Sequence, residues 1–292
     1  MKHGIDEASG EVATSRGLEY VVRTATREGL TRDLPHGPKD LLWVANSATL
    51  IYGEHDAVLV DTYTSVQQNA ELVDWVRSFD RNLTHIYITH GHGDHFFGLS
   101  QLLDAFPDAR AVATAGTAAT ARTQGEPEWL GEFWERLFPG QIPPLHYPEA
   151  LRGGSFELEG HRLEVVEAGY TDTDNTTCLW IPDLRLLIAG DVAYNDTHQF
   201  TARTTAESRE EWARAAERLA ELNPTAVIAG HKKPEAADSP TILAETARYL
   251  REFNRAAAAT ATAEELYDDM LGRYPRRANP GALWGGAKAA KP

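Results

Sequence analysis

The sequence contains very little cysteine and no long apolar run, and both shortages narrow the class of protein. Cys178 is the single cysteine among 292 residues, so an internal disulfide is excluded and the fold does not depend on an oxidising compartment. Cys178 lies in an apolar stretch and is expected to be a buried strand residue. No apolar run approaches the roughly 20 residues that span a bilayer, and the polar start of the chain does not resemble a signal peptide. These shortages predict a cytoplasmic protein without a membrane partner.

Positive charge is also scarce. Lysine and arginine number 28 against 43 aspartates and glutamates, which gives a formal net charge of −15 at pH 7. A surface of this sign repels polyanions over long range, which argues against nucleic acid or an acidic membrane as a partner. It does not exclude a small anion held at a locally positive metal site. Hydrophobic residues make up 42% of the chain, enough for one α/β enzyme domain with a large core.

One structural plan occurs twice along the chain. In each copy a buried strand ends at an aspartate, a helix follows, and a second strand ends at a histidine. The predicted first copy runs from Asp61 to His90, and the second from Asp191 to His231. Ligand sites of open α/β sheets lie at the carboxyl ends of strands. The duplication therefore predicts two similar α/β halves that place these side chains at one edge.

The regions around this plan are assigned by composition and pattern. We expect a flexible arm over residues 1–17, a catalytic domain over 18–256, and a C-terminal helix and irregular tail over 257–292. Two capping boxes, Ser208 with Glu211 and Thr262 with Glu265, predict where helices begin. Residues 117–150 are helical and aromatic, then rich in proline, and are expected to cover a pocket. The aromatic content of this cover and of the tail would suit a homodimer interface.

Three imidazoles and a carboxylate lie within six residues, at His90, His92, Asp94 and His95. Divalent transition metals bind imidazole nitrogen and carboxylate oxygen, and a short loop after a strand can aim alternate side chains at one point. An extended loop would project His90 and His92 in the same direction. Asp94 and His95 could then face a second point close by. The spacing therefore predicts a metal site on this loop.

The stretch Thr89–Gly98 resembles the signature of the metallo-β-lactamase superfamily, and further marks of that family follow in order. These marks are Val60-Asp61-Thr62, Gly190-Asp191 and Gly230-His231, and the resemblance covers roughly residues 18–256. It implies an α/β fold, an αββα four-layer sandwich of two similar halves with the site at the shared edge of two mixed sheets. It also implies a first metal held by His90, His92 and a third histidine. Asp94, His95 and His231 would hold a second metal, with Asp191 bridging.

One position departs from the family pattern, because Tyr170 stands where the third histidine is expected. Tyr170 could bind the first metal as a phenolate, which would make that metal less Lewis-acidic than an imidazole would. It could instead stay neutral and hydrogen-bond to the substrate or the hydroxide, with the first metal bound weakly or not at all. Asp172 or Asp174 in the same loop could also be the ligand. The sequence leaves these alternatives open.

The resemblance implies a metal-dependent hydrolase with two zinc ions, or manganese or iron in their place. A metal-bound hydroxide would open a small cyclic amide, carbamate or ester, a group that includes heteroaromatic xenobiotics. Asp94 and Tyr170 are assigned as catalytic groups, the first moving a proton and the second donating to an oxyanion. Asp61 is expected to orient the histidine loop, and Lys232 could meet a substrate carboxylate. Five side chains are predicted to line the substrate pocket: Phe96, Phe97, Trp129, Trp134 and His198.

Other functions use the same residues. Members of this superfamily with one iron carry out oxygen chemistry through histidine and aspartate ligands. Thioester and phosphodiester hydrolases also occur, although the charge of −15 disfavours a nuclease. The loss of one histidine could also mark a degenerate, non-catalytic binding protein. The other six ligand positions are intact, which argues against that decay.

Overall fold

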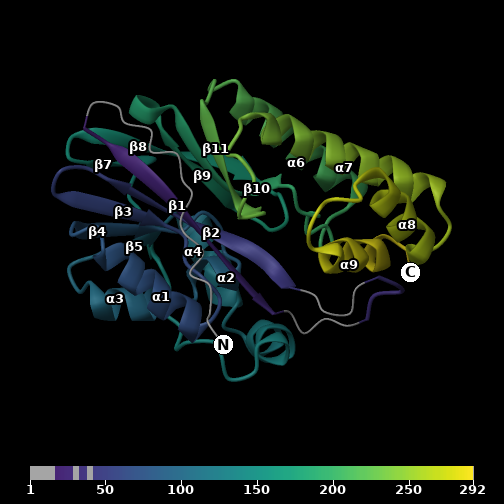
Figure 1. The fold of residues 1–292 in the computed structure, drawn as a ribbon, viewed down its shortest axis with the longest axis horizontal. Coiled ribbons are helices and arrows are strands. Elements are labelled where there is room, and N and C mark those ends of the chain that lie inside the picture. The colour runs from purple at the N-terminus through teal and green to yellow at the C-terminus, as the bar shows by residue number, and fades with distance from the viewer. Residues whose placement is uncertain (1–16, 29–32, 38–41, 292) are drawn as a thin grey trace.

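A curled sheet with helices on its outer faces makes up the computed structural model (Figure 1), which describes residues 17–28, 33–37 and 42–291. The predicted arm therefore lies outside the described residues except at its last position. The strand order is β6-β5-β4-β3-β2-β11-β10-β9-β8-β7, with β1 paired to β2. The strands are β1 Glu19–Glu28, β2 Leu42–Tyr52, β3 Asp56–Val60, β4 Asn82–Tyr87, β5 Arg110–Ala113, β6 Glu149–Ala150, β7 Ser155–Leu158, β8 His161–Gly169, β9 Thr176–Ile181, β10 Leu186–Asn195 and β11 Ala226–Lys232.

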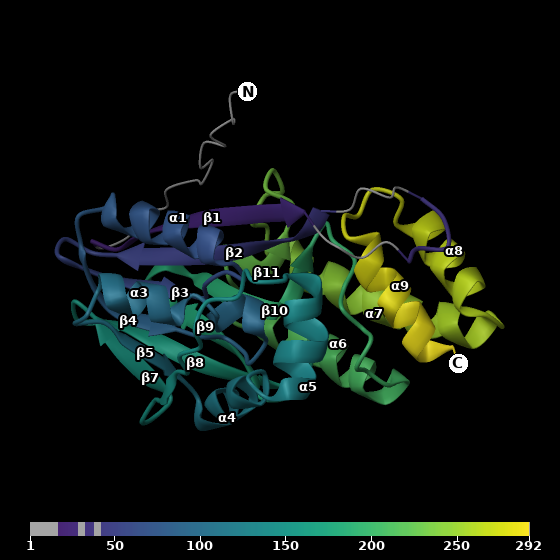
Figure 2. The same cartoon turned by 90° about the horizontal axis from the view of Figure 1, so that it is seen from below.

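Helices cover both outer faces of the curled sheet. In Figure 1 the strands lie between α1 and α3 at the lower left and α6 and α7 at the upper right. Figure 2 shows the C-terminal helices α8 and α9 beside α7, at the end away from α1 and α3. The helices are α1 Val66–Arg77, α2 Gly93–Phe96, α3 Leu99–Ala105, α4 Ala115–Thr123, α5 Pro127–Trp129, a π-helical turn Leu130–Glu135, a 3-10 turn Pro182–Leu184, α6 Ala206–Ala220, α7 Thr241–Ala259, α8 Ala263–Arg273 and α9 Pro280–Ala290.

Three apolar clusters separate four layers. A central cluster joins Ile51 and Val60 from one half of the sheet to Leu179 and Ile188 from the other. A second cluster lies beneath α1 and α3, and a third lies beneath α6 and α7. Burial of two opposed sheet faces and two helix layers is what an αββα sandwich requires. The predicted fold class is therefore confirmed.

The two halves of the sheet meet at the edge where the metal site is predicted. Strands β3 and β4 pair in parallel, and so do β10 and β11. The halves are joined where β11 meets β2 in antiparallel register, with His231 opposite Asn46. Strands β10 and β11 run further than their apolar runs suggested, because the backbone continues through the polar residues Asp191 and His231. Both side chains are thereby fixed by strand geometry.

Two predicted helix starts can be compared with the structure, and one of them differs. Helix α6 begins after Thr205, whose hydroxyl accepts from Ser208 N at 3.1 Å while Ser208 Oγ accepts from Thr205 N at 2.9 Å. Ser208 is thus the third helical residue, not the cap, because Thr205 fits the same box one turn earlier. The predicted box of Thr262 with Glu265 is present at the start of α8.

The tail is helical where an irregular segment was predicted. Helix α9 begins at a cap whose Asn279 side chain accepts from Ala282 N, and Pro280 occupies its first turn. Leu283 and Ala287 are buried and belong to a cluster with Tyr267 from α8. Glycine and alanine make up most of this helix, so its apolar stripe is too weak to be seen in the sequence. No helix of the described chain is long and apolar enough to cross a membrane.

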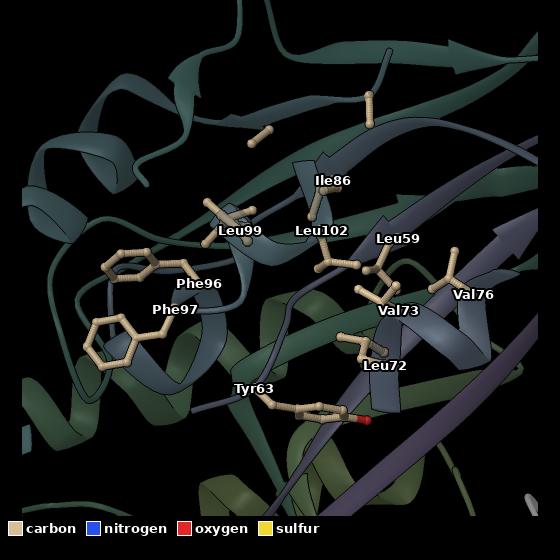
Figure 3. Packing of buried hydrophobic residues seen from close by; sticks show 14 of the residues in the cluster. Leu59, Tyr63, Leu72, Val73, Val76, Ile86, Phe96, Phe97, Leu99 and Leu102 are labelled. Atoms are coloured by element: carbon tan, nitrogen blue, oxygen red, sulfur yellow. The ribbon is translucent and has the colours of Figure 1, made fainter. Parts of the chain in front are cut away.

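Aromatic residues next to the histidine loop belong to the core. Phe96 and Phe97 are fully buried, and Figure 3 shows both rings beside Leu99 in the cluster beneath α1 and α3. Trp134 is also buried, with its ring centroid 5.2 Å from that of Phe97. These three side chains do not line a pocket as predicted. The helical turn of α2 carries Phe96 and Phe97 into this cluster, and the π-helical turn Leu130–Glu135 carries Trp134 into it.

Candidate metal centre

The loop that carries His90, His92, Asp94 and His95 is held in place by hydrogen bonds to Asp61. Its carboxylate accepts hydrogen bonds from Thr89 N at 2.8 Å and from Thr89 Oγ1 at 2.7 Å, and its Oδ2 lies 3.1 Å from His95 Nδ1. Asp61 has a φ of 60°, a left-handed conformation that few residues other than glycine adopt. This backbone turns the carboxylate back under the loop. His95 Nε2 is then left to face the centre.

Three groups of closely spaced ligand atoms lie at this edge, and one of them, Asp61 with His90 and His95, uses the carboxylate that supports the loop; the other two are the candidate metal positions. The first consists of His90, His92, Asp172 and Asp191, and the second of Asp94, His95 and His231. In each group the ligand atoms all lie within 4.8 Å of one another. All seven side chains are buried. The structure thus brings together the six ligands expected with intact positions, and adds Asp172 to them.

Asp191 lies between the two groups. Its Oδ2 is 3.2 Å from His231 Nε2 and 3.9 Å from His90 Nε2, and its Oδ1 is 3.4 Å from His95 Nε2. The Asp191 carboxylate lies so close to the backbone at position 230 that only glycine fits there, because a Cβ would collide with the carboxylate. A bridging role is therefore sterically open to Asp191.

Two residues that the sequence did not single out fix the carboxylates. Asn46 donates from Nδ2 to Asp94 Oδ2 and to the Asp94 carbonyl, both at 3.1 Å. Tyr194 donates its hydroxyl hydrogen to Asp191 Oδ2 at 2.7 Å. Neither residue could be identified from a sequence pattern. Asn46 lies far from Asp94 in the sequence, and Tyr194 has the pattern of an ordinary buried strand residue. Such outer partners orient ligands before a metal arrives.

The residues present fit a divalent cation. Four buried ligand atoms of this cluster have no hydrogen-bond partner, namely His90 Nε2, His95 Nε2, Asp172 Oδ2 and Asp191 Oδ1. Buried polar atoms without partners are costly, and a cation placed among them would satisfy several at once. Imidazole nitrogen and carboxylate oxygen are donors that zinc, manganese and iron accept.

The titration behaviour of the cluster also indicates a need for positive charge. Burial lowers the pKa of His90 well below its usual value, so this ring is neutral and able to act as a ligand. Burial alone would lower the pKa of His95, but the Asp191, Asp94 and Asp61 carboxylates raise it to about 10. Without a metal, the carboxylates therefore hold a proton on a neighbouring imidazole. A divalent ion would supply that charge instead.

The Tyr170 hydroxyl is bound to the backbone of Arg203. It donates to the carbonyl oxygen of Arg203 at 2.7 Å. Burial, with the charges of Asp174 and Asp172, raises the pKa of Tyr170, so the phenol stays protonated at neutral pH. The predicted roles of Tyr170 as a ligand or an oxyanion donor would require its hydroxyl to give up this hydrogen bond. The backbone turn at this loop brings in Asp172, two residues later.

Three side chains gather beside His92, the most exposed of the seven ligand side chains, and we call them the mouth: Trp129, Phe200 and Arg203. The ring centroids of Phe200 and Trp129 lie 5.9 Å and 6.5 Å from that of His92. The Arg203 guanidinium lies over the Trp129 ring, 4.3 Å from its centroid. Trp129 is the predicted pocket residue that the structure places beside the ligands. Phe200 and Arg203 had no signal in the sequence.

His198 and Lys232 are engaged elsewhere. His198 is fully buried, with Nδ1 2.9 Å from the Tyr249 hydroxyl, so it does not line the predicted pocket. Lys232 is buried in an ion pair with Asp238 and has no charge free for a substrate carboxylate.

Comparisons with known proteins place this architecture. Residues 41–231 match the family model described as the Metallo-beta-lactamase superfamily. Similar curated proteins include type 2 metallo-beta-lactamases of Bacillus sp. strain 170 and Bacillus cereus, at 25% and 24% identity over 60% of this chain and 62% of each of theirs. A metal-dependent hydrolase of Brucella ovis is 26% identical over 44% of this chain and 46% of its own. The chain thus spans less than two thirds of the length of these relatives.

Solved structures show the same fold. A metallo-beta-lactamase family protein from Thermus thermophilus has a TM-score of 0.62 at 24% identity, covering 92% of this chain and 91% of that one. A metallo-beta-lactamase from Pontibacter korlensis has a TM-score of 0.60 at 19% identity, covering 82% and 98%. At such identities the likeness establishes the fold and leaves the substrate to the site.

Proposed function

Because this chain belongs to the metallo-β-lactamase superfamily, we propose that it is a metal-dependent hydrolase that opens a small cyclic amide, carbamate or ester. The observation that carries the proposal is the convergence of four unpartnered buried ligand atoms at one edge of the sheet. A decayed site would not be expected to keep such costly atoms together. The names of the similar proteins, lactamases and metal-dependent hydrolases, also support it.

The residues divide the catalytic tasks. Two zinc ions, when bound by the two ligand groups, would lower the pKa of a water from about 15.7 to about 7 and so supply hydroxide at neutral pH. Asp94 is held by Asn46 and lies beside His231, where it can take the proton of the nucleophile and pass it to a leaving group. Asp61 keeps His95 in the orientation in which Nε2 faces the centre.

The mouth sets the class of substrate. Trp129 and Phe200 present aromatic rings beside His92, and such walls favour small, flat, largely apolar molecules. The seven ligand side chains themselves are buried, so a substrate would approach them beside these rings. Lactones, lactams and benzoxazolinone-type cyclic carbamates are neutral before ring opening and match both features. The net charge of −15 favours these neutral molecules over polyanions.

A zinc-loaded sample assayed on a panel of lactones, lactams and cyclic carbamates tests this function. We expect ring opening of at least one class, and loss of about 1000-fold or more in kcat/KM in His92→Ala and Asp191→Ala, because both remove direct ligands. Circular dichroism of each variant should show an intact fold. Full activity in either variant, or no turnover of any class by metal-loaded protein, would contradict the proposal.

A second candidate function is favoured by the donor types. Two histidines and a carboxylate with room for another ligand are also the set that non-haem iron uses for oxygen chemistry. Each ligand group contains these donors. Loading with ferrous iron followed by measurement of oxygen uptake separates the two functions. A colourless zinc protein that hydrolyses its substrate without oxygen excludes the second.

A further inference from the structure

We infer that Asp172 completes the first metal position in place of the missing histidine, so that both positions have the same set of donors. The inference rests on the proposed metal-dependent function and deepens it by assigning a ligand. The first position would have His90, His92 and Asp172. The second would have His95, His231 and Asp94, with Asp191 shared between them.

The loop that carries Asp172 orients its carboxylate for this role. Oδ1 accepts a hydrogen bond from Thr171 Oγ1 at 2.8 Å. This leaves Oδ2 facing His92 Nδ1 at 3.0 Å and His90 Nε2 at 4.0 Å. Oδ2 is a buried oxygen without an aligned hydrogen bond, and its close contacts are these two imidazoles. An ion between this oxygen and the two imidazoles removes the cost of burying it.

The other residues considered for the third ligand are placed differently. Tyr170 is occupied by its bond to the carbonyl oxygen of Arg203. Asp174 is exposed and belongs to none of the groups of closely spaced ligand atoms found in the described chain. Asp172 is fully buried at its side chain. Within the loop it is therefore the one carboxylate that can reach the first position.

Matching donors change the charge of the site. Two divalent ions and three carboxylates leave one net positive charge, whereas a histidine at the third position would leave two. The first ion would be a weaker Lewis acid and would attract anionic substrates less strongly. This favours a neutral carbonyl compound over a phosphodiester. A second carboxylate also suits manganese and ferrous iron better than a third imidazole does.

Metal content is the test, and it does not depend on activity. Metal-free protein would be titrated with zinc against a chromophoric chelator, and the ions per chain counted by mass spectrometry. We expect two ions in the natural protein with affinities of similar size. Asp172→Ala should keep one ion and weaken the other by at least about 100-fold, beyond the loss typical for outer partners. Asp174→Ala and Tyr170→Phe are matched controls from the same loop and should keep both.

Two outcomes would overturn the inference. One is an Asp172→Ala protein that binds two ions as tightly as the natural chain, and the other is a Tyr170→Phe protein that loses one. If Asp172→Ala fails to fold, Asp172→Asn keeps the shape of the side chain while removing its charge, and the same zinc count applies. A protein with two matched ions and no turnover of any cyclic substrate would refute the proposed function and leave the ligand assignment intact.

Discussion

The metal centre has two regions that are built differently: the mouth, and a second region that we call the base, formed by Asp61, Asn46 and Tyr194. At the base, Asp61, Asn46 and Tyr194 are all nearly or fully buried, and each makes side-chain hydrogen bonds of 2.7 to 3.1 Å to the histidine loop or to ligand carboxylates. At the mouth, Trp129 and Phe200 are half-buried and come from separate segments. Each ring contacts His92, and the Arg203 guanidinium lies over the Trp129 ring. Two of the three side chains at the base thus come from strands β2 and β10, whereas the two rings of the mouth come from α5 and from the segment after β10.

Of the changes that separate the base from the mouth, replacement of Asp61 should have the largest effect on metal affinity and stability. Asp61→Ala leaves Thr89 N without its acceptor and His95 free to rotate. Loss of such a partner typically weakens metal binding about 10–100-fold, and the unpaired buried donor costs about 1–3 kcal/mol of stability. Zinc titration and denaturant unfolding measure the two effects. An Asp61→Ala protein with unchanged zinc affinity would show that the loop is rigid without its base.

Tyr194→Phe tests the base with a smaller chemical change and a smaller expected loss of metal affinity. The variant keeps the ring and loses only the hydroxyl that donates to Asp191. A hydrogen bond to a charged group is worth about 1.5–3 kcal/mol, and the lower end of that range corresponds to a fall of about tenfold in metal affinity. Tyr249→Phe, whose hydroxyl meets His198 and no ligand, is the matched control. Equal zinc affinity in the two variants would remove Tyr194 from the base.

The sequence predicted the local part of the site and missed the part made by folding. His90 to His95 are neighbours in the chain, so their type and spacing were visible, and the aspartates and histidine at strand ends followed from the repeated plan. Asn46 meets Asp94 through the pairing of β2 with β11, which no local pattern reports. Phe96 and Phe97 were read as pocket walls because aromatics adjoin the ligands, whereas helix geometry turned them into the core. The presence of an aromatic residue beside a ligand does not by itself show whether the ring lines a pocket or packs in the core.

At the mouth, Trp129→Ala should change substrate binding without changing metal content. The ring lies beside His92 and supports Arg203, so its removal opens the entrance and frees the guanidinium. We expect KM to rise about tenfold, equal to about 1.4 kcal/mol of lost contact, with two ions still bound. Trp134→Phe, a change within the core, controls for general loosening. A loss of zinc in Trp129→Ala would mean that the mouth and the base are not separate.

The smallest effect at neutral pH is expected at His198, behind the mouth. Its backbone N–H donates to the Ala278 carbonyl at 2.8 Å, which ties the segment of Phe200 to the C-terminal region. Burial, together with Arg277, lowers the pKa of His198 to about 3. The folded protein therefore keeps this ring neutral while the unfolded chain takes up a proton below about pH 6.5. Stability is unaffected above that pH and falls as pH drops from about 6.5 towards 3.

His198→Gln should remove this acid sensitivity. Below pH 6.5 its unfolding free energy should fall less steeply than that of the natural protein, by up to about 1.4 kcal/mol per pH unit. Denaturant unfolding of both metal-free proteins across this range measures the difference, because the ligand histidines titrate in both. His36→Gln, which removes an exposed imidazole far from the mouth in the sequence, is the control for a histidine-to-glutamine change as such. Parallel curves for His198→Gln and the natural protein would mean that the buried ring takes up its proton without unfolding, and that the segment behind the mouth is as open to water as the mouth itself.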